Sequence, residues 1–75
     1  MNQRAITDCI GTVRTWKGTF GFIECKAVGT DVFCHFEQIE GEGDFRRFYE
    51  GDVVAFTAVH TRKGWQAQDA RRVRG

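Results

Sequence analysis

The sequence has 75 residues, 41% of them apolar and 28% charged, which suits one small globular domain and excludes a disordered chain. Its net charge of +1 argues against a uniform polycation that binds any nucleic acid through charge alone. There is no apolar run long enough to cross a bilayer, and the opening MNQR does not resemble a secretory segment, so we expect a single domain over residues 1–75, located in the cytoplasm and without a membrane partner.

Five short strands are predicted, separated by turns that contain glycine. The first two, residues 9–16 and 20–25, flank a short turn, and a polar turn at residues 26–30 leads to the third strand, residues 31–36. A long acidic connection follows, in which residues 44–50 have room for one helical turn. The last two strands, residues 53–60 and 65–73, flank a hairpin turn. Because closure removes exposed edges, we expect an all-β fold, a five-stranded antiparallel Greek-key β-barrel (OB-fold).

The three cysteines indicate neither a disulfide framework nor a metal site. They are odd in number, and no two of them form a C-x-x-C pair. Cys34 and His35 are neighbours on a predicted strand, so their side chains point to opposite faces and cannot hold one ion together. We expect reduced cysteines packed as small hydrophobic residues, with no metal and no cofactor.

Charge is distributed unevenly along the chain. Residues 37–52 carry six acidic and two basic side chains, whereas residues 60–75 carry five basic side chains and one acidic one. This distribution predicts a local basic rim beside a site rather than a field of one sign over the whole surface.

The second and third predicted strands, FGFIEC and DVFCHF, each separate their side chains onto two faces. One parity buries Ile23, Val32 and the cysteines, whereas the opposite parity would bury His35 and Glu24, which is less favourable. The favoured parity leaves aromatic rings together on the outside of two adjacent strands. Such an exposed patch usually marks a site, and every nucleobase has a π-face that stacks on flat rings. We call these four residues the aromatic platform: Phe20, Phe22, Phe33 and His35.

These motifs resemble the cold-shock domain, the nucleic-acid-binding barrel of bacterial cold-shock proteins and Y-box proteins. That family has an RNP1-like K-G-[FY]-G-F-I motif and an RNP2-like V-F-V-H-F motif, matched here by GTFGFI at residues 18–23 and VFCHF at residues 32–36. Similar flanks at residues 11–13, 39–43, 50–56 and 64–67 extend the resemblance over nearly the whole chain.

The resemblance implies roles for individual residues. The aromatic platform matches the base-stacking residues of the family, and Phe36 matches a ring that supports or extends it. Phe45 matches a loop phenylalanine that contacts bases, and Asp31 a polar residue that hydrogen-bonds a base edge. Basic residues that match the family's cations, or that lie beside the predicted platform, form the basic rim: Arg14, Lys17, Arg62 and Lys63.

Three departures from the family pattern affect this assignment. The first hairpin is two residues shorter than usual, so Thr15 takes the place of the family's stacking tryptophan and Trp16 is displaced by one residue. We predict that Trp16 reaches the platform through the tighter turn; the alternative is a platform with one subsite fewer, because a shift of one residue changes the face. Relative to the family pattern, Asp44 resembles a one-residue insertion in the long acidic connection, just before Phe45. Trp65 replaces a proline and either adds a stacking position or covers the barrel.

The sequence therefore predicts a protein that binds single-stranded RNA or DNA as a monomer, with an RNA-chaperone or gene-regulatory role implied by the resemblance. An enzyme is not favoured, because the sequence has no nucleophile with a base at recognisable spacing and no phosphate loop. The alternative is a protein-interaction barrel that uses the same aromatic face. The basic rim favours the nucleic-acid interpretation.

Overall fold

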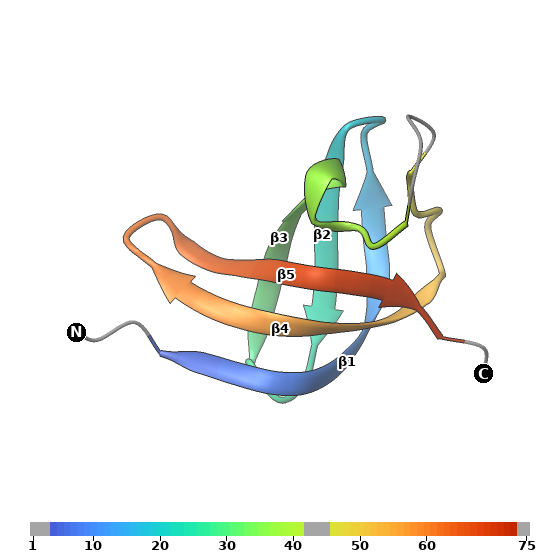
Figure 1. Cartoon of the computed structure of the whole chain (residues 1–75). Coiled ribbons are helices and arrows are strands. Elements are labelled where there is room, and N and C mark those ends of the chain that lie inside the picture. The colour runs from blue at the N-terminus through green and yellow to red at the C-terminus, as the bar shows by residue number, and fades with distance from the viewer. Residues whose placement is uncertain (1–3, 42–45, 74–75) are drawn as a thin grey trace.

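A computed structural model describes residues 4–41 and 46–73, which form a closed five-stranded β-barrel (Figure 1). The strands are β1 (Ala5–Trp16), β2 (Phe20–Cys25), β3 (Thr30–His35), β4 (Val53–Thr61) and β5 (Gly64–Arg72). One short 3₁₀ turn, η1 (Phe36–Gln38), follows β3. The expected all-β, OB-type barrel is thus confirmed. The first strand begins earlier than predicted, and the third ends at His35 because Phe36 opens η1.

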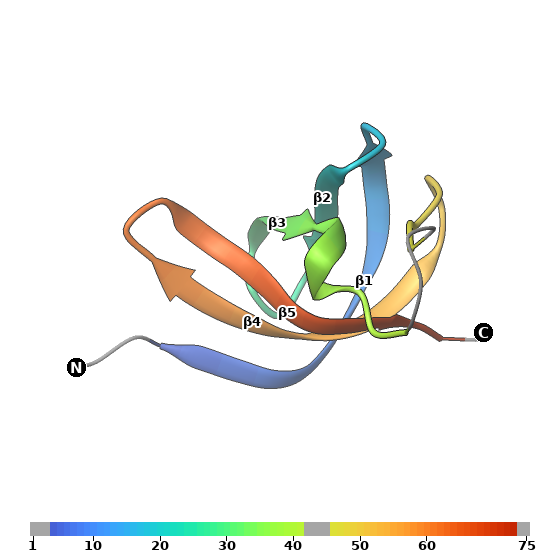
Figure 2. The ribbon, with the colours of Figure 1, turned by 45° about the horizontal axis from the view of Figure 1, so that its top comes forward.

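The barrel closes in the order β1-β2-β3-β5-β4. The pairs β1–β2, β1–β4, β2–β3 and β4–β5 are antiparallel, whereas β3 and β5 meet in parallel with Phe33 opposite Gln66. β1 is long and bent, so that its first part runs beside β4 and its last part beside β2 (Figures 1 and 2). One parallel pairing therefore closes the barrel, between β5 and the strand that carries Phe33, β3.

The side chains of β2 and β3 that face the core are the ones predicted from alternation. In β2, Gly21, Ile23 and Cys25 are buried, and in β3 Val32 and Cys34 are fully buried. All three cysteines are free buried thiols. Burial raises the pKa of the Cys34 thiol from 9.0 to about 12. The interior strand positions are thus filled by β-branched and thiol side chains, which leaves the phenylalanines of these strands outside.

The described residues that precede β4, 46–52, lie beside β1 (Figures 1 and 2). This segment contributes Phe48, which is 1% exposed and joins the core cluster. The helical turn expected at residues 44–50 is not found at residues 46–50, where the Phe48 side chain instead packs in the core. Among the described residues, no helix is long and apolar enough to cross a membrane.

Candidate nucleic-acid interface

The predicted aromatic platform forms on the outer face of β2 and β3. The register pairs Phe20 with His35 and Phe22 with Phe33, so the four side chains occupy one patch. Phe33 is central: its ring stacks on Phe20 with centroids 5.7 Å apart and planes at 28°, and meets Phe22 at 5.8 Å and 69°. Phe22 is the most open ring of the three, with 36% of its surface exposed. The platform therefore presents flat apolar faces to solvent on a rigid sheet.

His35 is oriented at the end of the platform by the backbone of Glu37. The Glu37 N–H donates to His35 Nδ1 over 3.3 Å, so Nδ1 is an acceptor and the neutral ring carries its proton on Nε2. In this tautomer the 3.8 Å approach of the Glu37 carboxylate to Nδ1 is not an ion pair. The imidazole also lies 4.8 Å from the Phe36 ring. His35 thus offers both a ring face for stacking and an N–H donor.

The four residues of the basic rim are all exposed. Arg14, on the outer side of β1, forms an ion pair with Asp31 at 3.6 Å, which holds both side chains at one end of the platform. Lys17 is exposed in the first turn. Arg62 and Lys63 are exposed in the turn that leads into β5, the strand that adjoins Phe33. These cations can neutralise phosphates, and Asp31 can accept a hydrogen bond from a base edge.

The prediction that Trp16 reaches the aromatic platform is wrong, because its ring lies in the core. The register of β1 against β2 shifts at Arg14: Val13 faces Ile23, but Thr15 faces Phe22 and Trp16 faces Gly21. This β-bulge turns Thr15 outward and Trp16 inward. The indole is 7% exposed, contacts Phe48 and donates from Nε1 to Gly18 O over 3.1 Å. The aromatic platform therefore lacks the Trp16 ring, which agrees with the alternative of a platform with one subsite fewer.

Gly21 accommodates the inward tryptophan. A Cβ built on Gly21 would overlap the Thr15 carbonyl oxygen and lie 2.6 Å from Trp16 Cε3, closer than a carbon–carbon contact allows. The glycine between the two phenylalanines thus lets Trp16 fill the core directly beneath the platform.

Comparison with known families and proteins agrees with this geometry. The family model described as 'Cold-shock' DNA-binding domain matches residues 9–73. The chain belongs to the cold-shock domain family. It is 47% identical over 60 residues to the cold shock-like protein CspLB of Listeria monocytogenes (77% of this chain, 88% of that protein). It is 42% identical over 65 residues to the cold shock-like protein CspA of Stigmatella aurantiaca (84% of this chain, 94% of that protein).

A solved structure shows the same fold. The structure titled "drosophila Unr CSD456" superposes with a TM-score of 0.73 at 24% identity, and the match covers 95% of this chain and 27% of that chain. This likeness concerns the barrel alone.

Two further aromatic residues of this cold-shock domain lie at the border of the core. Phe36 packs against the core cluster, with the Arg46 guanidinium 5.9 Å from its ring centre. Trp65 is half-buried: it packs against the core cluster, and its ring centre lies 4.8 Å from that of His60. Part of the indole stays exposed, so an added stacking position stays a prediction. Phe45 lies outside the described residues.

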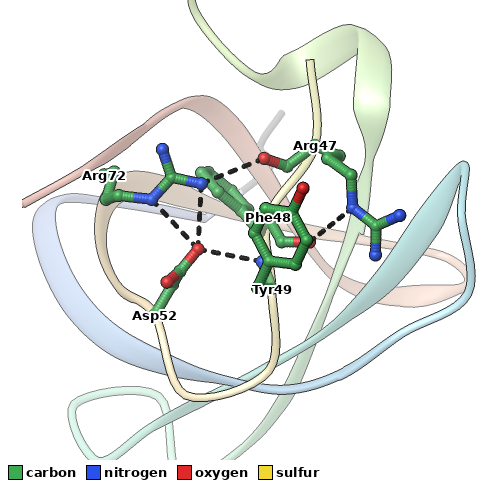
Figure 3. Close-up of polar contacts among 5 residues, drawn as sticks. All are labelled: Arg47, Phe48, Tyr49, Asp52 and Arg72. Carbon is green, nitrogen blue, oxygen red and sulfur yellow. Dashed lines mark hydrogen bonds and ion pairs between the residues drawn. The ribbon is translucent and has the colours of Figure 1, made fainter. Parts of the chain in front are cut away.

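Sequence reasoning missed one polar cluster in this cold-shock domain, shown in Figure 3. Asp52 Oδ2 accepts hydrogen bonds from the Tyr49 N–H at 2.9 Å and Arg72 Nε at 3.0 Å, and Arg72 also donates to Arg47 O at 3.1 Å. Partial burial alone would raise the pKa of Asp52, but the Tyr49 amide and the Arg72 guanidinium outweigh it and lower that pKa.

The same segment carries an aromatic residue that the sequence prediction did not include. Tyr49 is 57% exposed, and the Arg47 guanidinium lies 4.5 Å from its ring centre. The sequence gives no clear signal for this residue, because RRFYE belongs to a segment without strand or helix periodicity.

Proposed function

We propose that this domain binds single-stranded RNA or DNA by stacking successive bases on the aromatic platform, without catalysis. The observation that carries the proposal is the group of three phenyl rings around Phe33 on the outer face of the sheet. Base–aromatic stacking contributes about 1–3 kcal/mol per base and tolerates different sequences. The basic rim supports the backbone of the strand, and Asp31 and His35 supply hydrogen bonds to base edges.

By the same proposal, the domain acts in the cytoplasm as a monomer that keeps transcripts single-stranded or regulates gene expression. Membership of the cold-shock domain family supports this role. The charge of the basic rim supports nucleic acid over a protein partner, because all four of its cations are exposed and Asp31 is paired with Arg14.

A binding titration tests the proposal. Because Trp16 is buried and Trp65 packs inward, fluorescence anisotropy of a labelled oligopyrimidine is a more direct signal than tryptophan quenching. We expect the wild-type protein to bind and Phe22→Ala to lose about 1–3 kcal/mol of binding free energy with its fold intact. His60→Ala is the matched control, since it removes an exposed ring outside the platform. Absence of binding to both RNA and DNA oligonucleotides at tens of micromolar protein rejects the proposal.

A further inference from the structure

The pair formed by Arg47 and Tyr49, the Arg47–Tyr49 pair, is an exposed aromatic and cationic feature outside the aromatic platform. Tyr49 exposes 57% of its surface, against 36% for Phe22, the most open phenyl ring of the platform. The Arg47 guanidinium covers the tyrosine ring at 4.5 Å. In the part of the chain that the structure describes, no acidic side chain forms an ion pair with Arg47. A ring face and a cation at one point are what a nucleotide requires for its base and phosphate.

The pair is held rigidly by the rest of the fold. Asp52 Oδ2 accepts the Tyr49 N–H, and Arg72 bridges this carboxylate to Arg47 O (Figure 3). Arg47 Nε donates to Phe48 O at 3.2 Å, which fixes the guanidinium side chain against its own segment. Between the two residues, Phe48 is anchored in the core. Such pre-organisation reduces the entropy lost on binding.

The turn that follows the pair lies beside β1, the strand next to β2 of the platform. The Gly51 N–H donates to Val13 O at 2.9 Å, and the Val13 N–H donates to Asp52 O at 2.8 Å, so this turn lies alongside β1. The next residue of β1 is Arg14, which belongs to the basic rim, and Thr15 beyond it faces Phe22. A strand that leaves the platform over Thr15 and Arg14 therefore meets the Arg47–Tyr49 pair.

We propose that the Arg47–Tyr49 pair is an additional subsite for single-stranded nucleic acid, in which a base stacks on Tyr49 and Arg47 contacts a phosphate or the base. The subsite compensates for the first-hairpin tryptophan, which the bulge at Arg14 has turned into the core. This inference rests on the proposed function, because it extends the same bound strand.

Two oligopyrimidines separate the subsite from the platform. OB folds occupy about 4–16 nucleotides, so a strand of about 4 nucleotides fits the platform and one of about 10 extends beyond it. We expect wild-type protein to bind the longer strand more tightly. Tyr49→Ser should weaken binding of the longer strand about tenfold, or 1.4 kcal/mol, and change binding of the shorter strand by less than about twofold.

Matched variants identify the cause of the loss. Tyr49→Phe keeps the π-face and should bind like wild type, whereas Tyr49→Leu keeps an apolar contact without a π-face and should bind like Tyr49→Ser. Arg47→Ser should weaken the longer strand only, and Arg71→Ser, which removes the same charge from an exposed position on β5, should not. Thermal melting of each variant verifies that it is folded.

The outcomes are distinguishable. Failure of the wild-type protein to bind either strand rejects the proposed function itself. If the wild type binds both strands but Tyr49→Ser leaves the longer strand unaffected, or weakens both strands equally, the additional subsite is rejected while the platform stands.

Discussion

The rings of Trp16 and Phe48 meet edge to face, with centroids 5.7 Å apart and planes at 70°. This contact joins the end of β1 to the connection that precedes β4, and both residues belong to the core cluster. The tryptophan of the first hairpin therefore stabilises the barrel from inside. The outer position at this level is taken by Thr15, which faces Phe22.

Replacing Trp16 should affect stability and not base stacking. We expect Trp16→Ala to lower the free energy of unfolding by about 3–5 kcal/mol, because it leaves a cavity beside Phe48. Trp16→Phe fills part of that space and should lose less. Urea denaturation measures both variants. In an anisotropy titration, folded Trp16→Phe should bind an oligopyrimidine like wild type; a tenfold weaker complex with unchanged stability would place the indole in the binding site.

Gly21 should tolerate no side chain, because the backbone of β1 passes close to it. A Cβ at this position overlaps the Thr15 carbonyl oxygen, a backbone atom, and lies 2.6 Å from Trp16 Cε3, so we expect Gly21→Ala to destabilise the protein by about 1–3 kcal/mol through overpacking. Trp16→Leu removes the ring but leaves the Thr15 carbonyl in place, so the loss caused by Gly21→Ala should persist in the double variant. Full recovery of that loss in the Trp16→Leu background, measured by urea denaturation, would show that the indole alone excludes a side chain at this position.

Strand alternation was sufficient to predict the platform, because in β2 and β3 every side chain follows a period of two without interruption. It failed at Trp16, because the bulge at Arg14 adds one residue to β1 and reverses the face of all that follows. The Arg47–Tyr49 pair was missed because its segment has no strand or helix period of its own. Its orientation depends on the burial of Phe48 and on Arg72, which is 20 residues from its partner Asp52.

Binding should depend only weakly on salt, because few cations stand beside the platform. Four rim cations, one of them already paired with Asp31, predict a slope of log K against log salt between about −2 and −3 for a single strand. Measured over a series of KCl concentrations, Arg62→Gln should reduce the slope by about 0.7. Arg71→Gln, on the outer surface of β5, serves as the control and should leave the slope unchanged. A much steeper slope would show that phosphate contacts, not stacking, dominate the affinity.

Cys34 should be inert to alkylation in the folded protein. Burial raises the pKa of its thiol to about 12, so at pH 8 the reactive thiolate is absent and the sulfur is also inaccessible. We expect mass spectrometry to find no reaction of Cys34 with iodoacetamide under native conditions and modification of all three cysteines in urea. Ile10→Cys, at a position that is 53% exposed, is the positive control. Rapid native modification of Cys34 would contradict the burial.

The ion pair between Asp52 and Arg72, 2.9 Å long, should make stability depend on pH. The Tyr49 amide and Arg72 lower the pKa of Asp52 below its ordinary value of 3.8, despite the opposing effect of burial. Its stabilising contribution is therefore present above pH 3.8 and is lost as the pH falls through the lower pKa of the folded state. Because the pair is partly exposed, we expect Asp52→Asn to lose about 1 kcal/mol at pH 7.

Urea denaturation at neutral and strongly acidic pH measures this contribution. The difference in unfolding free energy between wild type and Asp52→Asn should shrink toward zero at acidic pH, since a protonated Asp52 resembles asparagine in charge. Asp69→Asn is the matched control: it removes the same charge from an exposed position of β5 that has no ion pair among the described residues. Its stability difference should be small at neutral pH and should change little with acidification. A difference for Asp52→Asn that persisted unchanged in acid would show that the carboxylate charge does not hold the Arg47–Tyr49 segment in place.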